Sequence, residues 1–195
     1  GIIGPQGVFL GGASHWYPSF EIPLLATFEL TVDLPEDWRS VSQGRRSDRS
    51  VDSGRVRETW AEGKPQDELF LIAGAFTEYR KGDDGVEAMV FLREPDASLA
   101  VRYLGLTSRY IRMYEGLIGP YPYAKLALVE NFWETGYGMP SFTLLGPRVI
   151  RLPFIPRTSY PHEILHNWWG NGVYVDYEEG NWSEGLTAYL ADHLM

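Results

Sequence analysis

The stretch that decides the fold of this chain is Pro161–Asn171, which reads PHEILHNWWGN. His162 and His166 lie four residues apart, and Glu163 directly follows the first histidine. On a helix, residues i and i+4 share one face, so both imidazoles can point at one spot. A zinc ion accepts two such nitrogens, and a glutamate in this position can take a proton from an activated water. The pattern therefore predicts a zinc-binding helix, with packing and hydrogen bonding of the two histidines as the alternative.

A second helix, downstream of the first, supplies a candidate third ligand. We expect the helix to begin near Ser159, a suitable N-cap, with Pro161 in the first turn, where a missing N–H costs little. A second helix is expected to start at Asn181 or Ser183. Glu184 lies in its first turn and follows the second histidine after 17 intervening residues, enough for a loop and a returning helix.

Two imidazoles and one carboxylate leave one position of a tetrahedral zinc ion open, which is the pattern of catalytic rather than structural sites. Three rival carboxylates lie in the connection between the two helices: Asp176, Glu178 and Glu179. Acids in such a Gly- and Asp-rich connection are usually solvated, so Glu184 is the preferred third ligand.

Composition excludes several classes of protein and site. The 195 residues are 44% hydrophobic and 14% aromatic, which is ample for a packed core. The net charge of −9 argues against general affinity for nucleic acid. The absence of cysteine excludes disulfides, thiolate zinc sites and cysteine nucleophiles. No apolar run is long enough to span a bilayer. Because the chain begins at Gly1 without an initiating Met, we expect it to be part of a longer protein whose compartment the sequence does not indicate.

The first part of the chain is predicted to be rich in β-strands. Residues 27–34 alternate strictly, with the apolar side chains of even-numbered positions on one face. Further strands are predicted at 7–17 (ending in a turn), 69–79 and 86–92, with a turn at Lys81–Gly85. Five arginines in 42–57 suggest an anion-binding patch or a solvated loop or hairpin. The solvated loop or hairpin is preferred over the anion-binding patch, because acids lie nearby and no aromatic residues interleave.

The pattern changes at Pro95. Asp96 is a plausible N-cap, and apolar residues then recur at steps of three and four over about six helical turns. These residues are Leu99, Tyr103, Leu106, Tyr110, Met113 and Leu117. We therefore predict an α+β protein with a domain boundary near residue 93, separating a β-rich part (1–93) from a helix-led α/β part (94–195).

Two more strands are predicted in the second part, at Ala124–Val129 and 136–146. Pro140 within the second segment indicates an edge strand, because proline cannot donate to a β-ladder. Free backbone groups on such an edge can pair with an extended peptide. The segment is thus a platform for a peptide substrate or an ordinary edge strand.

Taken together, these motifs resemble a known family. The sequence HEILHNWWGN at 162–171, followed by WSEG at 182–185, resembles the gluzincin metallopeptidases of the membrane alanyl aminopeptidase family. That family shows H-E-x-x-H-x-W-[FW]-G-N and then a Trp before an N-E-G-type sequence. Further resemblances occur upstream in the same order, at Trp16–Pro18, Ala73–Gly74, Gly119–Tyr123 and Lys125–Val129.

The resemblance implies a fold, a cofactor and residue roles. Residues 1–93 would be the end of an N-terminal β-sandwich-like domain, and 94–195 the first half of a thermolysin-like catalytic domain. Zn²⁺ would be held by His162, His166 and Glu184, with Glu163 as general base and later proton donor, and the substrate would be a peptide. The segment Gly138, Met139 and Pro140 would contact that substrate.

Three departures from the family pattern narrow this expectation. The family usually has 18 residues between the second histidine and the ligand glutamate, whereas this chain has 17 between His166 and Glu184. Its G-x-M-E-N motif, whose Glu holds the substrate's free amino terminus, corresponds to Tyr137–Ser141 here, so Pro140 replaces that anchor. Glu130 or Glu134 could substitute for it. The family's oxyanion-stabilising tyrosine lies further downstream than Met195, so we expect this piece alone to be inactive.

The sequence therefore predicts a zinc-dependent, aminopeptidase-like peptidase. One alternative is a zinc endopeptidase or other hydrolase without an amino-terminal anchor. The other is a non-catalytic scaffold that retains the fold, against which the complete ligand set argues.

Overall fold

The computed structural model describes residues 1–18, 24–82 and 85–193. These residues form three β-sheets and three α-helices, which confirms the predicted α+β class. The chain divides into two compact units, Gly1–Glu78 and Tyr79–Met195, and each is described separately. No helix in the described ranges is long and apolar enough to cross a membrane.

The first unit contains two antiparallel sheets. The three-stranded sheet has the order β3 (Ala26–Pro35), β6 (Arg55–Gln66), β5 (Arg45–Asp52). The four-stranded sheet has the order β1 (Ile2–Gly4), β2 (Gly7–Leu10), β7 (Leu71–Gly74), β4 (Arg39–Val41). A short 3-10 helix, η1 (Gly12–Ser14), follows β2, as expected for a strand and turn. In β3, Phe28, Leu30, Val32 and Leu34 are more buried than their neighbours, which confirms the predicted alternation.

The arginine-rich segment forms the β5–β6 hairpin, as preferred from the sequence. Arg46 forms ion pairs with the buried Glu58 at 2.9 Å and with Glu78 at 2.5 Å. Arg55 and Arg57 both reach Asp33, at 2.6 and 3.4 Å. These arginines are paired within the unit, so they contribute to the sheet rather than forming a cationic patch.

The second unit is built on a five-stranded sheet of order β11-β12-β10-β9-β8. Its strands are β8 (Thr77–Lys81), β9 (Glu87–Leu92), β10 (Lys125–Glu130), β11 (Gly136–Met139) and β12 (Phe142–Leu145). The central strand β10 pairs in parallel with both β9 and β12, whereas β11 runs antiparallel to β12. The apolar side chains of β10 are accordingly buried on both faces.

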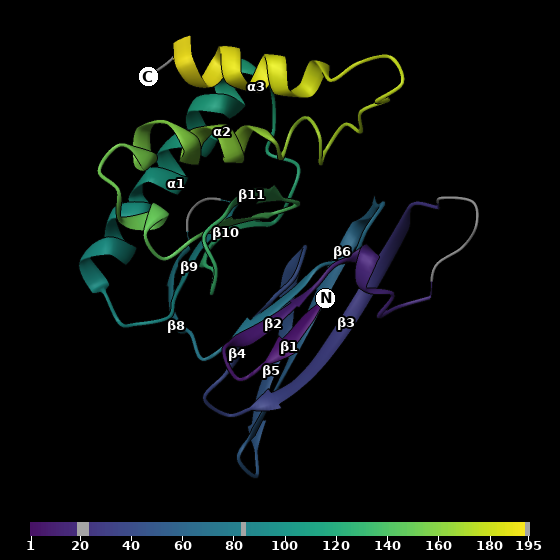
Figure 1. Ribbon diagram of the computed structural model, residues 1–195, viewed down its shortest axis with the longest axis vertical. Coiled ribbons are helices and arrows are strands. Elements are labelled where there is room, and N and C mark those ends of the chain that lie inside the picture. The colour runs from purple at the N-terminus through teal and green to yellow at the C-terminus, as the bar shows by residue number, and fades with distance from the viewer. Residues whose placement is uncertain (19–23, 83–84, 194–195) are drawn as a thin grey trace. The chain divides into compact units, whose positions relative to one another are not determined.

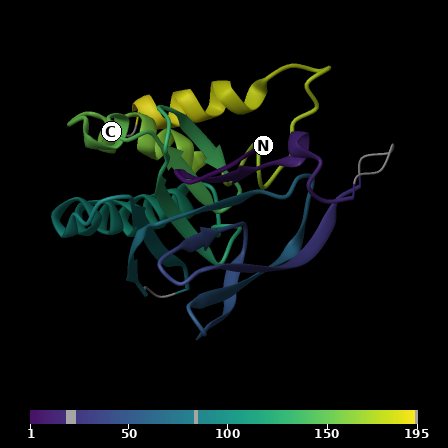
Figure 2. The ribbon, with the colours of Figure 1, turned by 60° about the horizontal axis from the view of Figure 1, so that its bottom comes forward.

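Three helices cover this sheet: α1 (Ala97–Leu117), α2 (Ser159–Leu165) and α3 (Trp182–His193). Figure 1 shows all three on the same side of β9, β10 and β11, with α3 farthest from the strands. Two 3-10 turns, η2 (Val149–Arg151) and η3 (Ile155–Arg157), precede α2. The connection after α2 loops outward and brings α3 back alongside α2 (Figure 2).

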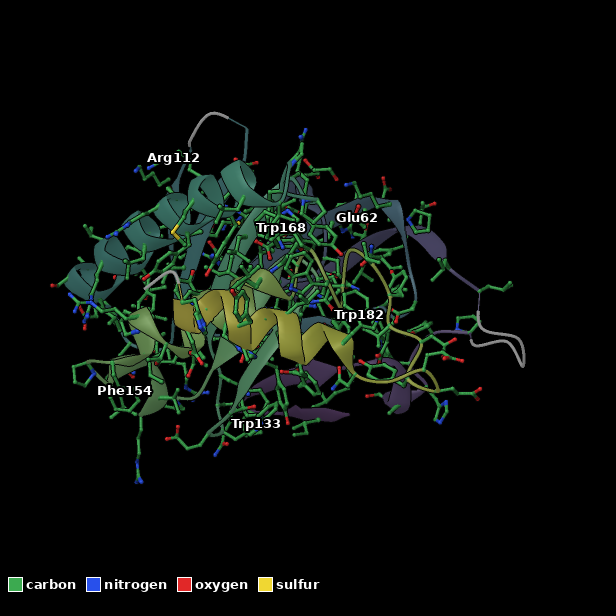
Figure 3. The ribbon with its side chains drawn as sticks, turned by 90° about the horizontal axis from the view of Figure 1, so that it is seen from above. Glu62, Arg112, Trp133, Phe154, Trp168 and Trp182 are labelled. Carbon is green, nitrogen blue, oxygen red and sulfur yellow. The ribbon has the colours of Figure 1, made fainter. Side chains whose placement is uncertain are left out.

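The long helix begins where the sequence predicts. The Asp96 carboxylate accepts the Leu99 N–H at 2.9 Å, a normal N-cap. The buried face is rotated slightly from the predicted stripe, because Leu104, Thr107 and Ile111 are buried while Leu117 is exposed. The aromatic residues on this face are core. Trp168 lies inside the unit against Tyr114 and Tyr121, whereas Trp182 lies at the surface (Figure 3).

Two predicted strands differ from those observed. The segment 69–79 is interrupted after Gly74, so that β7 joins one sheet and β8 the other. The segment 136–146 is a hairpin rather than one strand. Pro140 and Ser141 form its turn, with φ of +66° at Ser141, because a proline followed by a residue with positive φ suits a tight turn. The edge position predicted for this segment is confirmed for β11.

The division between the units lies earlier than the change of sequence character at residue 93. The reason is that β9 pairs with β10 along Glu87–Phe91 and so belongs with the helices that follow it. The turn predicted at Lys81–Gly85 lies partly outside the described residues.

Candidate functional site

The two histidines of α2 point at one place. The helix begins one residue earlier than expected, with Thr158 rather than Ser159 as the N-cap residue and Pro161 in the first turn. His166 directly follows the helix and keeps helical backbone angles (φ −57°, ψ −17°). The Nε2 atoms of His162 and His166 are consequently 3.2 Å apart. The predicted i, i+4 convergence of the imidazoles is thus present.

Glu184, in the first turn of α3, completes a group of three ligand atoms. Its Oε2 lies 3.4 Å from His162 Nε2, and its Oε1 lies 3.4 Å from His166 Nε2. The Asn181 side chain accepts the Glu184 N–H at 3.5 Å, so the first of the two expected caps holds this turn. Ser183 instead donates to Trp169 O at 3.2 Å and ties the start of α3 to the end of the histidine segment.

The rival acids lie elsewhere. Among the described residues, the cluster of metal-ligating side chains consists of His162, His166 and Glu184, whose ligand atoms all lie within 4.8 Å of one another. Asp176 instead accepts the backbone N–H of Glu178 in the exposed connection.

The separations between the two imidazoles and the Glu184 carboxylate are compatible with a tetrahedral zinc ion. Ligand atoms about 2.0–2.2 Å from zinc lie about 3.3–3.6 Å from one another at tetrahedral angles. The two Nε2 atoms are 3.2 Å apart, and each lies 3.4 Å from a different oxygen of the Glu184 carboxylate, so these separations are close to the ligand–ligand distances of a tetrahedral site. His166 Nδ1 lies 3.4 Å from Trp169 O. A proton on Nδ1 directed at this carbonyl leaves Nε2 unprotonated, with its lone pair available to a metal ion. Burial lowers the pKa of His166, which favours the neutral imidazole that binds metal.

Glu163 lies beside the ligand cluster but faces a different partner. Burial, reinforced by the nearby charge of Glu184, raises its pKa from 4.5 to about 7. The Gly138 N–H donates to the Glu163 carboxylate and opposes that rise. A carboxyl group whose pKa lies near neutrality can both accept and release a proton at physiological pH.

The raised pKa predicts a pH-dependent stability of the metal-free protein. The folded state holds the Glu163 proton more tightly than the unfolded state does. The stability gained from this proton is therefore fully present below about pH 4.5 and is lost as the pH rises through about 7. Glu163→Gln lacks this titration. Its free energy of unfolding, relative to wild type, should rise by on the order of 2 kcal/mol between about pH 5 and pH 8. Chemical denaturation with Glu179→Gln as the matched control measures this, and an equal difference at both pH values would contradict the assignment.

Gly138 approaches Glu163 so closely that a side chain would not fit. A Cβ at this position would lie 2.8 Å from Glu163 Oε2, 2.9 Å from Glu163 O and 3.2 Å from His166 Cβ. Asn171 Nδ2 donates to Gly138 O at 3.0 Å. Both backbone groups of Gly138 therefore bind the helix segment, and β11 is fixed against the cluster.

A second set of hydrogen bonds holds the β11–β12 turn. Asn167 Oδ1 accepts the Ser141 N–H at 2.8 Å and the Tyr121 hydroxyl at 3.0 Å. Lys125 Nζ donates to Ser141 Oγ at 2.8 Å from the central strand. All four of these residues are buried, so the turn that ends β11 is joined to both α2 and the core of the sheet.

A cavity of about 300 Å³ opens over the cluster. It is lined by residues 136–139 of β11, by the two histidines and Glu184, by Glu163, and by the loop residues Asn171 and Tyr177. The site thus combines three ligand atoms, a buried carboxyl group and an edge strand around one space.

Comparison with curated proteins shows similarity to aminopeptidases. The chain is 24% identical over 196 residues to the alanine/arginine aminopeptidase of Saccharomyces cerevisiae, and 23% identical over 198 residues to aminopeptidase M1-D of Oryza sativa subsp. japonica. Each alignment covers 92% of the chain but only 23% and 22% of the relative. The chain therefore spans about a quarter of the length of these curated relatives. No protein-family model matches the sequence.

Solved structures agree with the sequence comparison. An M1 zinc metallopeptidase from Deinococcus radiodurans matches 97% of the chain and 47% of its own length, with a TM-score of 0.74 at 19% identity. A mutant of an M1 zinc metallopeptidase from the same organism, bound to a Tyr-Ser-Ala substrate, matches 86% of the chain and 40% of its own length, with a TM-score of 0.67 at 18% identity. The chain shares the fold of the M1 zinc metallopeptidases. The resemblance to aminopeptidases of this group that the sequence predicted is confirmed.

Within this M1 fold, the expected substrate segment is only partly at the cavity. Gly138 and Met139 line it, whereas Pro140 is buried and is absent from the lining formed by the described residues. The two acids suggested as replacements for the amine anchor are engaged elsewhere. Glu130 pairs with Arg151 at 2.5 Å and accepts the Arg93 N–H, and Glu134 accepts the Arg148 N–H. The described carboxylates at the cavity are those of Glu163 and Glu184.

Sequence reasoning missed the roles of Asn167, Asn171 and Lys125 in this M1 fold. All three stood inside motifs that carried the resemblance, but their partners lie in the β11–β12 hairpin, 16 to 33 residues away. The available signal was Asn171, the fixed final position of the H-E-x-x-H-x-W-[FW]-G-N pattern, to which no role had been assigned.

Proposed function

We propose that the whole protein is a zinc-dependent peptidase of aminopeptidase type, with His162, His166 and Glu184 as the zinc ligands. The observation that carries this proposal is the convergence of two imidazole nitrogens and the Glu184 carboxylate, with separations of 3.2 to 3.4 Å, beside the buried Glu163 carboxyl group. Zinc in such a site acts as a Lewis acid and lowers the pKa of water. The complete ligand set, with Glu163 present, argues against a non-catalytic scaffold.

We assign Glu163 the proton transfers. Its carboxylate lies outside the ligand triangle but at the same cavity, where it can take a proton from the attacking water and pass it to the leaving amine. The Gly138 N–H holds one side of this carboxylate, which fixes its orientation without neutralising it. Burial in the site supplies the raised pKa that a group with both tasks requires.

We assign β11 the positioning of the peptide. It is the edge strand of the sheet and lines the cavity from Gly136 to Met139, so an extended peptide passing Glu163 would run along it. Both backbone groups of Gly138 already bind Glu163 and Asn171, so Gly138 itself does not pair with the peptide. Pro140 contributes through the turn rather than through contact with the substrate.

The fold similarity also supports a domain assignment. We propose that Gly1–Glu78 form the end of an N-terminal β-sandwich-like domain and Tyr79–Met195 the first half of a thermolysin-like catalytic domain, with the boundary moved from residue 93 because β9 pairs with β10. The parallel β9–β10–β12 core with α1, α2 and α3 on one side is the part that carries the site.

Zinc titration of the whole, metal-stripped protein tests the ligand set. We expect one zinc per chain, with weaker binding in Glu184→Ala because one of three ligands is lost. Glu179→Ala is the matched control, since this acid lies in the exposed connection just before α3. Zinc binding that is absent, or that is weakened equally by both substitutions, would overturn the proposal.

A peptidase without an amino-terminal anchor is the second candidate. The observation that favours it is the cavity lining, in which Pro140 does not take part and neither Glu130 nor Glu134 appears among the described residues. Hydrolysis rates of one peptide with a free and with an acetylated amino terminus separate the two candidates. An aminopeptidase cleaves only the free form at an appreciable rate, whereas equal rates would assign the second function.

A further inference from the structure

A second cavity lies between α1 and η3 and shares no lining residue with the zinc cavity. It has a volume of about 590 Å³, within the usual range for small-molecule sites. Arg102 and Arg109 of α1 and Arg157 of η3 line it together with Leu106, Tyr110 and Pro156. All of these residues belong to the unit Tyr79–Met195.

Three arginines, all of them exposed residues, line this one cavity. Arg102 and Arg109 are seven residues apart, which places them on one face of α1 about 10 Å apart along its axis. Arg157 approaches from the other wall. The Tyr110 hydroxyl donates to Pro156 O at 2.6 Å, so the two walls are joined at the base of the cavity. Burial raises the pKa of Tyr110, and the nearby charges of Arg109, Arg157 and Arg102 oppose that rise.

These arginines differ from the others in this unit. Within residues 1–18, 24–82 and 85–193, none of the three forms an ion pair, whereas Arg80, Arg148 and Arg151 each pair with a glutamate. No carboxylate is among the described residues that line the cavity. Three unneutralised cations thus gather in a chain whose net charge is −9. Like charges gathered at one place give a positive local potential that attracts an anion.

We propose that this cavity binds a small anion carrying at least two phosphate or carboxylate groups. Arginine binds both groups through paired N–H donors, and two arginines two turns apart with a third opposite suit a ligand with more than one anionic group. Leu106 and Pro156 offer apolar contact to the part of the ligand between those groups. This binding site is separate from the proposed peptidase reaction.

Calorimetric titration of the whole protein with pyrophosphate and with citrate at low ionic strength tests the proposal. We expect saturable binding of one ligand per chain that weakens as salt is added. Each of Arg102→Gln, Arg109→Gln and Arg157→Gln should weaken binding about tenfold or more, because a charge-assisted hydrogen bond is lost. Arg112→Gln is the matched control, since it removes the same charge from α1 outside the cavity lining (Figure 3 labels Arg112).

The outcomes separate specific binding from general attraction. Preference for pyrophosphate would assign phosphate as the recognised group, and preference for citrate would assign carboxylate. No saturable binding of either anion would overturn the proposal. So would equal weakening by Arg112→Gln, or unchanged binding when all three cavity arginines are replaced.

Discussion

Replacing Glu163 with Gln is expected to lower peptide turnover by about 10²–10⁴-fold while zinc binding is unchanged. Gln has nearly the same shape, and its amide oxygen can still accept the Gly138 N–H that holds Glu163. It cannot accept a proton at neutral pH, so the transfer from water to the leaving amine is lost. The proposed zinc ligands are other residues, so the site keeps its three candidate donors.

Single-turnover kinetics and metal content of the whole protein measure this effect together. Glu178→Gln, in the exposed connection, is the control for a lost carboxylate, and its turnover should equal that of wild type. Turnover retained in Glu163→Gln would remove Glu163 from the role of base. Loss of zinc in the same variant would instead make Glu163 part of the metal site.

Gly138→Ala is expected to lower turnover by about 10²-fold with zinc still bound. The added methyl group would lie 2.8 Å from Glu163 Oε2 and 2.9 Å from Glu163 O, so either β11 or the carboxylate must move. Displacement of a catalytic group by about 1 Å costs on the order of 10²-fold in rate. Overpacking of this kind also destabilises the fold by about 1–3 kcal/mol.

Gly136→Ala is the matched control on the same strand. Its added methyl group would lie 3.7 Å from Glu163 Oε1 and 3.9 Å from Leu145, which are ordinary van der Waals contacts. The two variants should therefore differ in kcat while circular dichroism shows both to be folded. Equal kcat values would show that the close approach of β11 does not position Glu163.

Local patterns in the sequence were sufficient for much of the fold. The strict alternation of β3, the Asp96 cap and the periodicity of α1 depend on neighbours within a few residues, and all three are observed. The i, i+4 histidine pair is likewise a property of a single helix. Its partner Glu184 could be proposed because its distance along the chain allows one loop and one returning helix.

The hairpin at Pro140 and the break after Gly74 were not predictable in the same way. Both depend on which strand each half pairs with, and the pairing is decided by contacts across the sheet rather than by the residues in the segment. The division between the units lies before β9 for the same reason, since the parallel β9–β10 pairing joins that strand to the helical part.

The sequence by itself determined the residue types of the proposed ligands, the helix that carries the two histidines and the proposed base beside them. Only the tertiary structure decided how that base is held. The contact of Gly138 with Glu163, the bond from Asn171 to Gly138 and the bond from Asn167 to Ser141 each join residues at least 25 apart. Such contacts exist only after β11, β12 and α2 have packed, because backbone groups of an edge strand have no fixed partner in the unfolded chain.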